Sequence, residues 1–257
     1  MEKTRLIIAA PQEQLSAARS HGFPTAHLIY AVAPDGALSA ADCPPAQDCT
    51  MAVDISRYCG TSPRELAAQI MRELKSRGYR SLLLDTGRSV NSRQRQLAGD
   101  VCRMCGQAGT ALFTYPALYD VCPGSYTLIG TALSGGSLDG HLRYAQKRFG
   151  KLAIEIELCQ RDFSLPSPDG QGLELTPCQL RSLCERYPVR RFFSQELCAD
   201  YFTYKFGRIA HLVLYDTAHT VAAKLDMASR LGIEYAFVHW RDISGCIQQL
   251  KALYRPS

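Results

Sequence analysis

The first half of the chain alternates short apolar runs, rich in β-branched and aromatic residues, with amphipathic stretches of helical period. Such alternation predicts βα units that build one parallel sheet. The clearest helix covers 62–77, because Ser62 or Thr61 can cap it, Pro63 occupies its first turn and Gly78 ends it. The pattern predicts eight strands, over 4–10, 26–33, 50–55, 81–85, 110–116, 126–132, 151–158 and 235–240.

This regular order breaks between 159 and 214. A loop rich in proline and glycine precedes a short helix that begins at Thr176-Pro177, and aromatic β-like segments follow. Regular order returns with a helix over 217–231 and the last strand. We therefore predict an α/β fold, a (β/α)8 TIM barrel forming one domain over 1–257 with a small α+β insertion over 160–214 after strand seven. The active site of such a barrel lies at the C-terminal ends of its strands.

The composition fits this fold and excludes several classes of function. The 257 residues match the typical size of about 250 for such a barrel. A net charge of +5, spread along the chain without a nucleic-acid-binding motif, predicts no nucleic acid partner. No segment reaches the roughly 20 apolar residues of a membrane span.

The cysteines and the N-terminus predict a reducing, cytoplasmic location. The apolar run that Pro11 closes is too short for a signal peptide. The 11 cysteines are odd in number, and several, such as Cys159 and Cys184, lie in periodic segments where a free thiol behaves as a small hydrophobe. The single Cys-x-x-Cys at 102–105 lacks matched partners, and no nucleotide-binding fingerprint occurs, so we expect no metal and no cofactor.

Several segments are similar to the strands and helices of one known enzyme family. Residues 26–33 with the turn at 34–36 look like its second strand, and 62–79 look like the segment before its catalytic strand. Residues 151–163 look like its seventh strand, and 213–216, 222–225, 231–233 and 240–241 look like its closing strand-helix-strand unit. On these segments the chain resembles glycoside hydrolase family 18, particularly its small bacterial branch with spore-germination and cortex-lytic relatives.

The catalytic strand departs from the family. The family pattern Asp-Gly-x-Asp-x-Asp-x-Glu falls on residues 80–87, where only the third aspartate, Asp85, remains and Gly87 stands at the glutamate position. In the family, that glutamate protonates the leaving oxygen, and the aspartate orients the substrate's acetamido group, which acts as the nucleophile. The resemblance therefore implies a degenerate active site.

Three carboxylates are candidates for the remaining chemistry. Alternation along strand four points Asp85 into the barrel, either as a substrate-orienting carboxylate or as a structural hydrogen-bond acceptor. In strand seven, Glu155 and Glu157 share the inward face, where an ionised carboxylate is costly unless it is paired. Either they have a raised pKa, with Glu157 and Asp85 as a replacement catalytic pair, or they pair with Arg or Lys inside the barrel, which we favour.

Aromatic and other polar residues near strand ends complete the candidate site. The resemblance implies that Trp240, the only tryptophan, floors the sugar site, although a tryptophan in the barrel core is equally ordinary. Tyr30 and Asp54 are further candidates for substrate binding. The basic residues Lys151, Lys224 and the Arg190-Arg191 pair are expected on the solvated surface.

Three functions remain open. The leading hypothesis is a catalytically degenerate family 18-like protein that recognises N-acetylglucosamine-containing glycans, such as peptidoglycan or chitin fragments. The second is an active O-glycosyl hydrolase with relocated acids, Asp85 together with Glu155 or Glu157. The third is a non-catalytic structural or interaction barrel. The resemblance also makes a spore-associated location compatible with the missing signal peptide.

Overall fold

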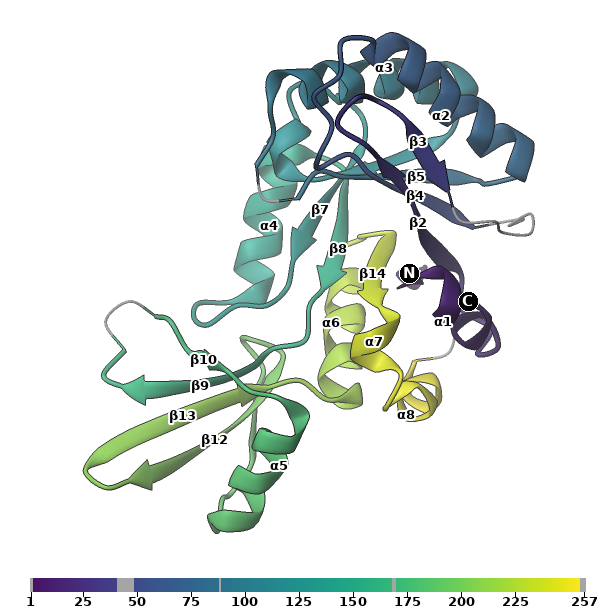
Figure 1. Cartoon of the computed structure of the whole chain (residues 1–257). Coiled ribbons are helices and arrows are strands. Elements are labelled where there is room, and N and C mark those ends of the chain that lie inside the picture. The colour runs from purple at the N-terminus through teal and green to yellow at the C-terminus, as the bar shows by residue number, and fades with distance from the viewer. Residues whose placement is uncertain (1, 41–48, 88, 168–169, 255–257) are drawn as a thin grey trace.

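The computed structural model describes residues 2–40, 49–87, 89–167 and 170–254. Within these residues, eight parallel strands form a closed barrel, because the first strand pairs with both the second and the last (Figure 1). The predicted (β/α)8 TIM barrel is confirmed. The barrel strands are β1 (Arg5–Ala10), β2 (Thr25–Val32), β4 (Thr50–Asp54), β5 (Ser81–Asp85), β6 (Ala111–Thr114), β7 (Tyr126–Gly130), β8 (Leu152–Ile156) and β14 (Tyr235–His239), and β3 (Leu38–Ala40) pairs antiparallel with β2.

Helices lie on the outside of the barrel (Figure 1). Helix α2 has its expected ends, with Pro63 in the first turn and Gly78 in a left-handed conformation after the last. The predicted side-chain cap is not formed, because the N-cap residue Ser62 makes no side-chain hydrogen bond to the helix. No helix in the described ranges is long and apolar enough to cross a membrane. The helices around the barrel are α1 (Gln12–Arg19), α2 (Pro63–Arg77), α3 (Ser92–Ala108), α4 (Leu138–Phe149), α6 (Ala218–Arg230), α7 (Trp240–Ile243) and α8 (Ile247–Leu253), and a short 3-10 helix, η1, covers Pro116–Leu118.

Alternation along the strands separates two apolar layers. Inward-pointing side chains, among them Leu83, Phe113 and Phe237, fill the barrel interior. Outward-pointing side chains, such as Ile154 and Ile156 of β8, pack in the layer that contains the surrounding helices. The two isoleucines therefore occupy the outer face that the sequence predicts for them. The barrel is filled with side chains in its middle, and its chemistry is confined to the strand ends.

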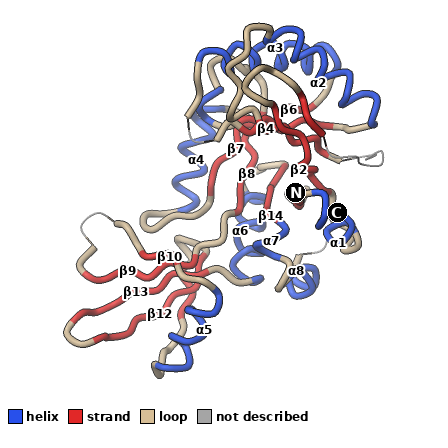
Figure 2. The backbone as a smooth tube through the Cα atoms, viewed as in Figure 1, coloured by secondary structure: helices blue, strands red, loops and turns tan. Residues whose placement is uncertain are grey.

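A second, antiparallel sheet lies between β8 and α6 in the chain. Its strand order is β10-β9-β13-β12-β11, and Figure 2 shows it set apart from the barrel strands. An apolar cluster joins one face of this sheet to its helix, through Phe202, Val213 and Leu183. The predicted α+β insertion after strand seven is thus present. Its elements are β9 (Gln160–Leu165), β10 (Leu173–Glu174), α5 (Pro177–Arg186), β11 (Phe192–Ser194), β12 (Ala199–Phe206) and β13 (Ile209–Tyr215).

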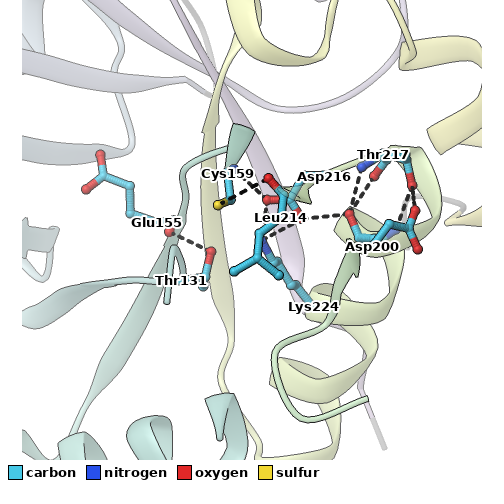
Figure 3. A network of polar contacts seen from close by, with 9 residues as sticks. Thr131, Glu155, Cys159, Asp200, Leu214, Asp216, Thr217 and Lys224 are labelled. Atoms are coloured by element: carbon cyan, nitrogen blue, oxygen red, sulfur yellow. Dashed lines mark hydrogen bonds and ion pairs between the residues drawn. The ribbon is translucent and has the colours of Figure 1, made fainter. Parts of the chain in front are cut away.

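A buried ion pair lies where this sheet joins the barrel (Figure 3). Lys224 Nζ donates to both carboxylate oxygens of Asp216, at 2.8 and 2.7 Å, and the two side chains are 1% and 0% exposed. The same carboxylate accepts from the Cys159 backbone N–H and from the Thr220 hydroxyl. The expectation that Lys224 is solvated is wrong, because Asp216, Thr220 and Lys224 follow one another at intervals of four residues along the start of α6.

We expect this ion pair to dominate the response of the fold to mutation. Lys224→Met would leave the Asp216 carboxylate buried without a cation, which should lower the free energy of unfolding by about 3–5 kcal/mol. The double variant Lys224→Met/Asp216→Asn, which removes both charges and keeps an oxygen for the Cys159 N–H, should recover most of that loss. Urea unfolding monitored by circular dichroism measures both values.

The matched control is Arg143→Met, because the Arg143–Asp139 pair on α4 is exposed. Removing an exposed pair should leave the unfolding midpoint nearly unchanged. An equal loss in Lys224→Met and in the double variant would contradict the assignment of the cost to an uncompensated charge.

Candidate functional site

Three carboxyl groups approach one another at the C-terminal end of the barrel. Asp85 is the last residue of β5, Glu155 lies near the end of β8, and Glu157 follows one residue after that strand. Asp85 lies two residues after the inward-facing Leu83, and Glu155 and Glu157 lie two and four residues after the inward-facing Ala153. Alternation therefore points all three into the barrel. Asp85 and Glu157 both raise the pKa of Glu155, which is evidence that the three groups interact.

Glu155 has a strongly raised pKa. Burial, first, and then the charges of Glu157 and Asp85 raise its pKa to about 7. A hydrogen bond from the Tyr115 hydroxyl to Glu155 Oε1, at 3.0 Å, acts in the opposite direction. Burial and the same carboxylates in turn raise the pKa of Tyr115. Glu155 is therefore about half protonated near neutral pH, and its hydrogen-bond partner is a phenol.

Neither Glu155 nor Glu157 belongs to an ion pair among the described residues. From the sequence we favour ion pairs with Arg or Lys inside the barrel, and the described residues show none for these two glutamates. The Glu155 main chain is fixed by Thr131, whose backbone N–H and hydroxyl both donate to its carbonyl. Figure 3 shows the Glu155 carboxyl directed away from that bond. Glu157 is exposed, and its Oε2 would lie 3.7 Å from a Cβ placed on Gly130.

Asp85 and Asp54 lie side by side as ladder partners at the ends of β5 and β4. Each accepts a hydrogen bond from the backbone N–H two residues onward, Gly87 at 2.9 Å and Ser56 at 2.8 Å. Both aspartates therefore close the turn that follows their strand. One oxygen of each is engaged in this way, so both predicted roles of Asp85, structural acceptor and carboxylate at the barrel mouth, are compatible with its position.

Gly87, which the sequence resemblance aligns with the family's glutamate, has a left-handed backbone, with φ of +64°. A Cβ at this position would lie 3.2 Å from Cβ of Ser56. Any L-residue here would strain the backbone and press on the neighbouring turn. The local turn conformation therefore favours glycine at this position.

The structure does not bring Tyr30 to this group of acids. A register shift in β2 between Leu28 and Tyr30 turns Tyr30 to the outer face, where it is 3% exposed. Its hydroxyl donates to Glu73 of α2 at 3.0 Å. Strict alternation would place Tyr30 inside the barrel. Because of the bulge, the prediction that Tyr30 lies in the substrate site does not hold.

Trp240 also lies outside the barrel interior. It begins α7 and packs against the outer apolar cluster, with its ring 5.4 Å from the ring of His21. The inward position at the end of β14 belongs instead to His239, the ladder partner of Ala9. Burial, first, and then Arg241 lower the pKa of His239, whereas Asp242, Asp85 and Glu157 act against them. A neutral imidazole therefore faces the acids where a tryptophan was predicted.

Two residues of the group, Tyr115 and His239, were not predicted. Both follow from the strand pattern, because Tyr115 is two residues after the inward Phe113 and His239 is two residues after the inward Phe237. Extending the inward-outward alternation by two residues beyond Phe113 and Phe237 would therefore have predicted both site residues from the sequence. In the described part of the chain, no group of three His, Cys, Asp or Glu side chains could hold a metal ion.

The closed parallel barrel, with polar side chains gathered at its C-terminal strand ends, defines the class of (β/α)8 TIM barrels. Comparison with solved structures is more specific about the kind of barrel. The chain is similar to the Bacillus cereus spore cortex-lytic enzyme SleL, with a TM-score of 0.63 and 16% identity over 93% of this chain and 71% of that one.

Chitinases have the same fold. The Chromobacterium violaceum chitinase matches with a TM-score of 0.61 and 14% identity, over 92% of this chain and 93% of that one. The class V chitinase from Nicotiana tobaccum matches with a TM-score of 0.63 and 12% identity, over 98% of this chain and 100% of that one. No family model and no curated protein matches the sequence. The resemblance to family 18 barrels is therefore confirmed at the level of the fold, which is all that such identities establish.

Glu155 should make the stability of the protein depend on pH. Its pKa is about 7 in the folded state and near 4.5 ordinarily, so the folded protein holds this proton more tightly. Its stabilising contribution should be complete below about pH 4.5 and disappear as the pH rises to about 7, a change of up to about 3 kcal/mol. Unfolding free energies of wild type and Glu155→Gln, measured across this range, should diverge accordingly.

Two further variants sharpen the measurement. Tyr115→Phe removes the hydrogen bond that opposes the shift, so the upper end of the window should move to higher pH. Glu65→Gln, an exposed carboxyl in the first turn of α2, should behave as wild type. A flat difference between wild type and Glu155→Gln would disprove the assignment.

Proposed function

We propose that this barrel binds N-acetylglucosamine-containing glycans at its C-terminal mouth and that hydrolysis by the family 18 mechanism is lost. The observation that carries the proposal is the convergence of Asp85, Tyr115, Glu155, Glu157 and His239 on the mouth of a barrel with this fold. Carboxylates, a phenol and an imidazole supply the directional acceptors and donors that sugar hydroxyl and amide groups require.

The ligand class is inferred from relatives of the same fold. One of them is a spore cortex-lytic enzyme, and several are chitinases. A mutant of the Nicotiana tobaccum chitinase was solved in complex with NAG4, and a mutant class V chitinase from Cycas revoluta in complex with (GlcNAc)3. This step is an analogy between folds, and peptidoglycan or chitin fragments are its two natural candidates. A cytoplasmic or spore-associated location stays a prediction from the sequence.

Loss of the family's catalytic step is inferred from Gly87. In family 18, a glutamate at this position donates the proton, and Gly87 has no side chain to do so. Its left-handed backbone and its proximity to Ser56 are unfavourable for any replacement side chain. Asp85, the residue that would orient an acetamido group, is retained and supports recognition without turnover.

One observation favours the second candidate, an active hydrolase with a relocated acid. A pKa of about 7 leaves Glu155 about half protonated at neutral pH, which suits a general acid. Asp85 and Glu157 would then be the carboxylates that assist it. In this hypothesis Glu155 donates the proton, because burial raises its pKa.

Binding and turnover of N-acetylglucosamine oligomers separate the candidates. Calorimetry should show binding by the wild type that Asp85→Asn and Glu157→Gln each weaken by roughly tenfold or more, the value of a hydrogen bond to a charged group. Product analysis should detect no hydrolysis. Asp139→Asn, a carboxylate on the exposed side of α4, is the matched control and should bind as wild type.

Other outcomes assign the other functions. Turnover that Glu155→Gln abolishes and Glu157→Gln merely slows would establish the relocated acid. Absence of both binding and turnover would overturn the glycan proposal and leave the structural or interaction barrel.

Restoring a glutamate at position 87 should not restore activity. Gly87→Glu would force an L-residue into the left-handed region, so we expect no turnover and a loss of unfolding free energy of about 1–2 kcal/mol. Gly106→Glu, on an exposed turn of α3 with open space around its Cβ position, is the control and should be neutral or slightly stabilising. Turnover in Gly87→Glu would show instead that the family's mechanism lacks only its proton donor.

A further inference from the structure

The hairpin of β12 and β13 projects from the second sheet, and its closed end lies far from the barrel (Figures 1 and 2). The two strands stay paired up to Phe206 and Ile209, which are direct ladder partners. Only Gly207 and Arg208 form the turn, and Gly207 has a φ of +60°. The tip is therefore narrow, well defined and presented on a regular sheet.

The tip carries apolar side chains that the rest of the protein leaves uncovered. Phe206 is 59% exposed and Ile209 is 49% exposed. They lie on the same face of the sheet as Phe202 and Val213, which α5 covers closer to the barrel. Leu165, at the end of the neighbouring strand β9, is also exposed, but as the ladder partner of Ala210 it lies on the opposite face of the sheet. Through Phe206 and Ile209, the apolar face of the sheet thus extends beyond its helix to the end of the hairpin.

The charges at the tip all have one sign. Lys205 precedes Phe206, Arg208 precedes Ile209, and both cations are exposed. Residues 201–215 contain no Asp or Glu, and Asp200, at the barrel end of β12, accepts a hydrogen bond from the Thr217 hydroxyl. Asp162, on the adjacent strand, is already bonded to the Tyr204 hydroxyl and the His211 ring. The closed end of the hairpin therefore carries two large apolar groups and two cations, and residues 201–215 supply no carboxylate to neutralise them.

We propose that this tip docks onto an anionic lipid surface. Phe206 and Ile209 would enter the boundary between headgroups and acyl chains, while Lys205 and Arg208 bind the acidic headgroups. A globular protein partner fits less well, because a stable interface buries about 800 Å² on each partner and a two-residue turn offers far less. The proposal is independent of the glycan site, which lies on the barrel.

Vesicle binding by the full chain tests the proposal. The protein should sediment with vesicles of equal parts phosphatidylglycerol and phosphatidylcholine and remain in solution with pure phosphatidylcholine. Lys205→Gln/Arg208→Gln should lower the partition coefficient roughly 25-fold, about fivefold for each cation near an anionic surface. Phe206→Ser/Ile209→Ser should lower it roughly tenfold or more. Raising the salt concentration should weaken binding of the wild type.

Each double variant has a matched control on the barrel. Lys75→Gln/Lys147→Gln removes the same two charges from exposed positions on α2 and α4. Tyr144→Ser/Leu253→Ser removes two apolar groups of similar exposure, 64% and 54%. Both controls should bind as wild type, and circular dichroism checks that every variant is folded. No binding to anionic vesicles, or an equal loss in tip and control variants, would overturn the proposal.

Discussion

The buried contact between Asp216 and Lys224 is the interaction on which the candidate site most depends. It closes the junction of the two sheets, because Asp216 accepts from the Cys159 N–H and donates its own N–H to the Cys159 carbonyl. Cys159 follows Glu157 by two residues. The pair therefore fixes the path of the chain directly after the acids of β8. Both charges are fully enclosed, so the geometry is stable only while each has the other.

The barrel then sets the chemistry of these acids by alternation and burial. An inward position on a strand places a carboxyl over a packed apolar core, where ionisation is unfavourable. Glu155 responds with a raised pKa and a phenol partner, whereas Glu157, one step beyond the strand, is exposed. Two glutamates on the same face of the chain, two residues apart, thus differ in their exposure to solvent.

Much of the fold could be predicted from the sequence because alternation and helix caps are local signals. The eight strands and the outward isoleucines of β8 followed from them, as did both ends of α2. The errors arose where tertiary structure overrides a local pattern. A bulge turned Tyr30 outward, an early helix start took Trp240 out of the barrel, and Lys224 was buried by a partner eight residues earlier in the chain. No periodicity signals any of these three events.

The fold survives at 12–16% identity to its neighbours because a barrel interior needs only apolar side chains of suitable volume at alternate positions. The turn after β5 has no such freedom. Asp85 accepts from the Gly87 N–H, and that turn requires the left-handed backbone which only glycine adopts without strain. An acidic residue at position 87 would therefore require a different turn conformation. Glu155 needs no such change, since its position on β8 already supplies the burial that raises the pKa of a carboxyl.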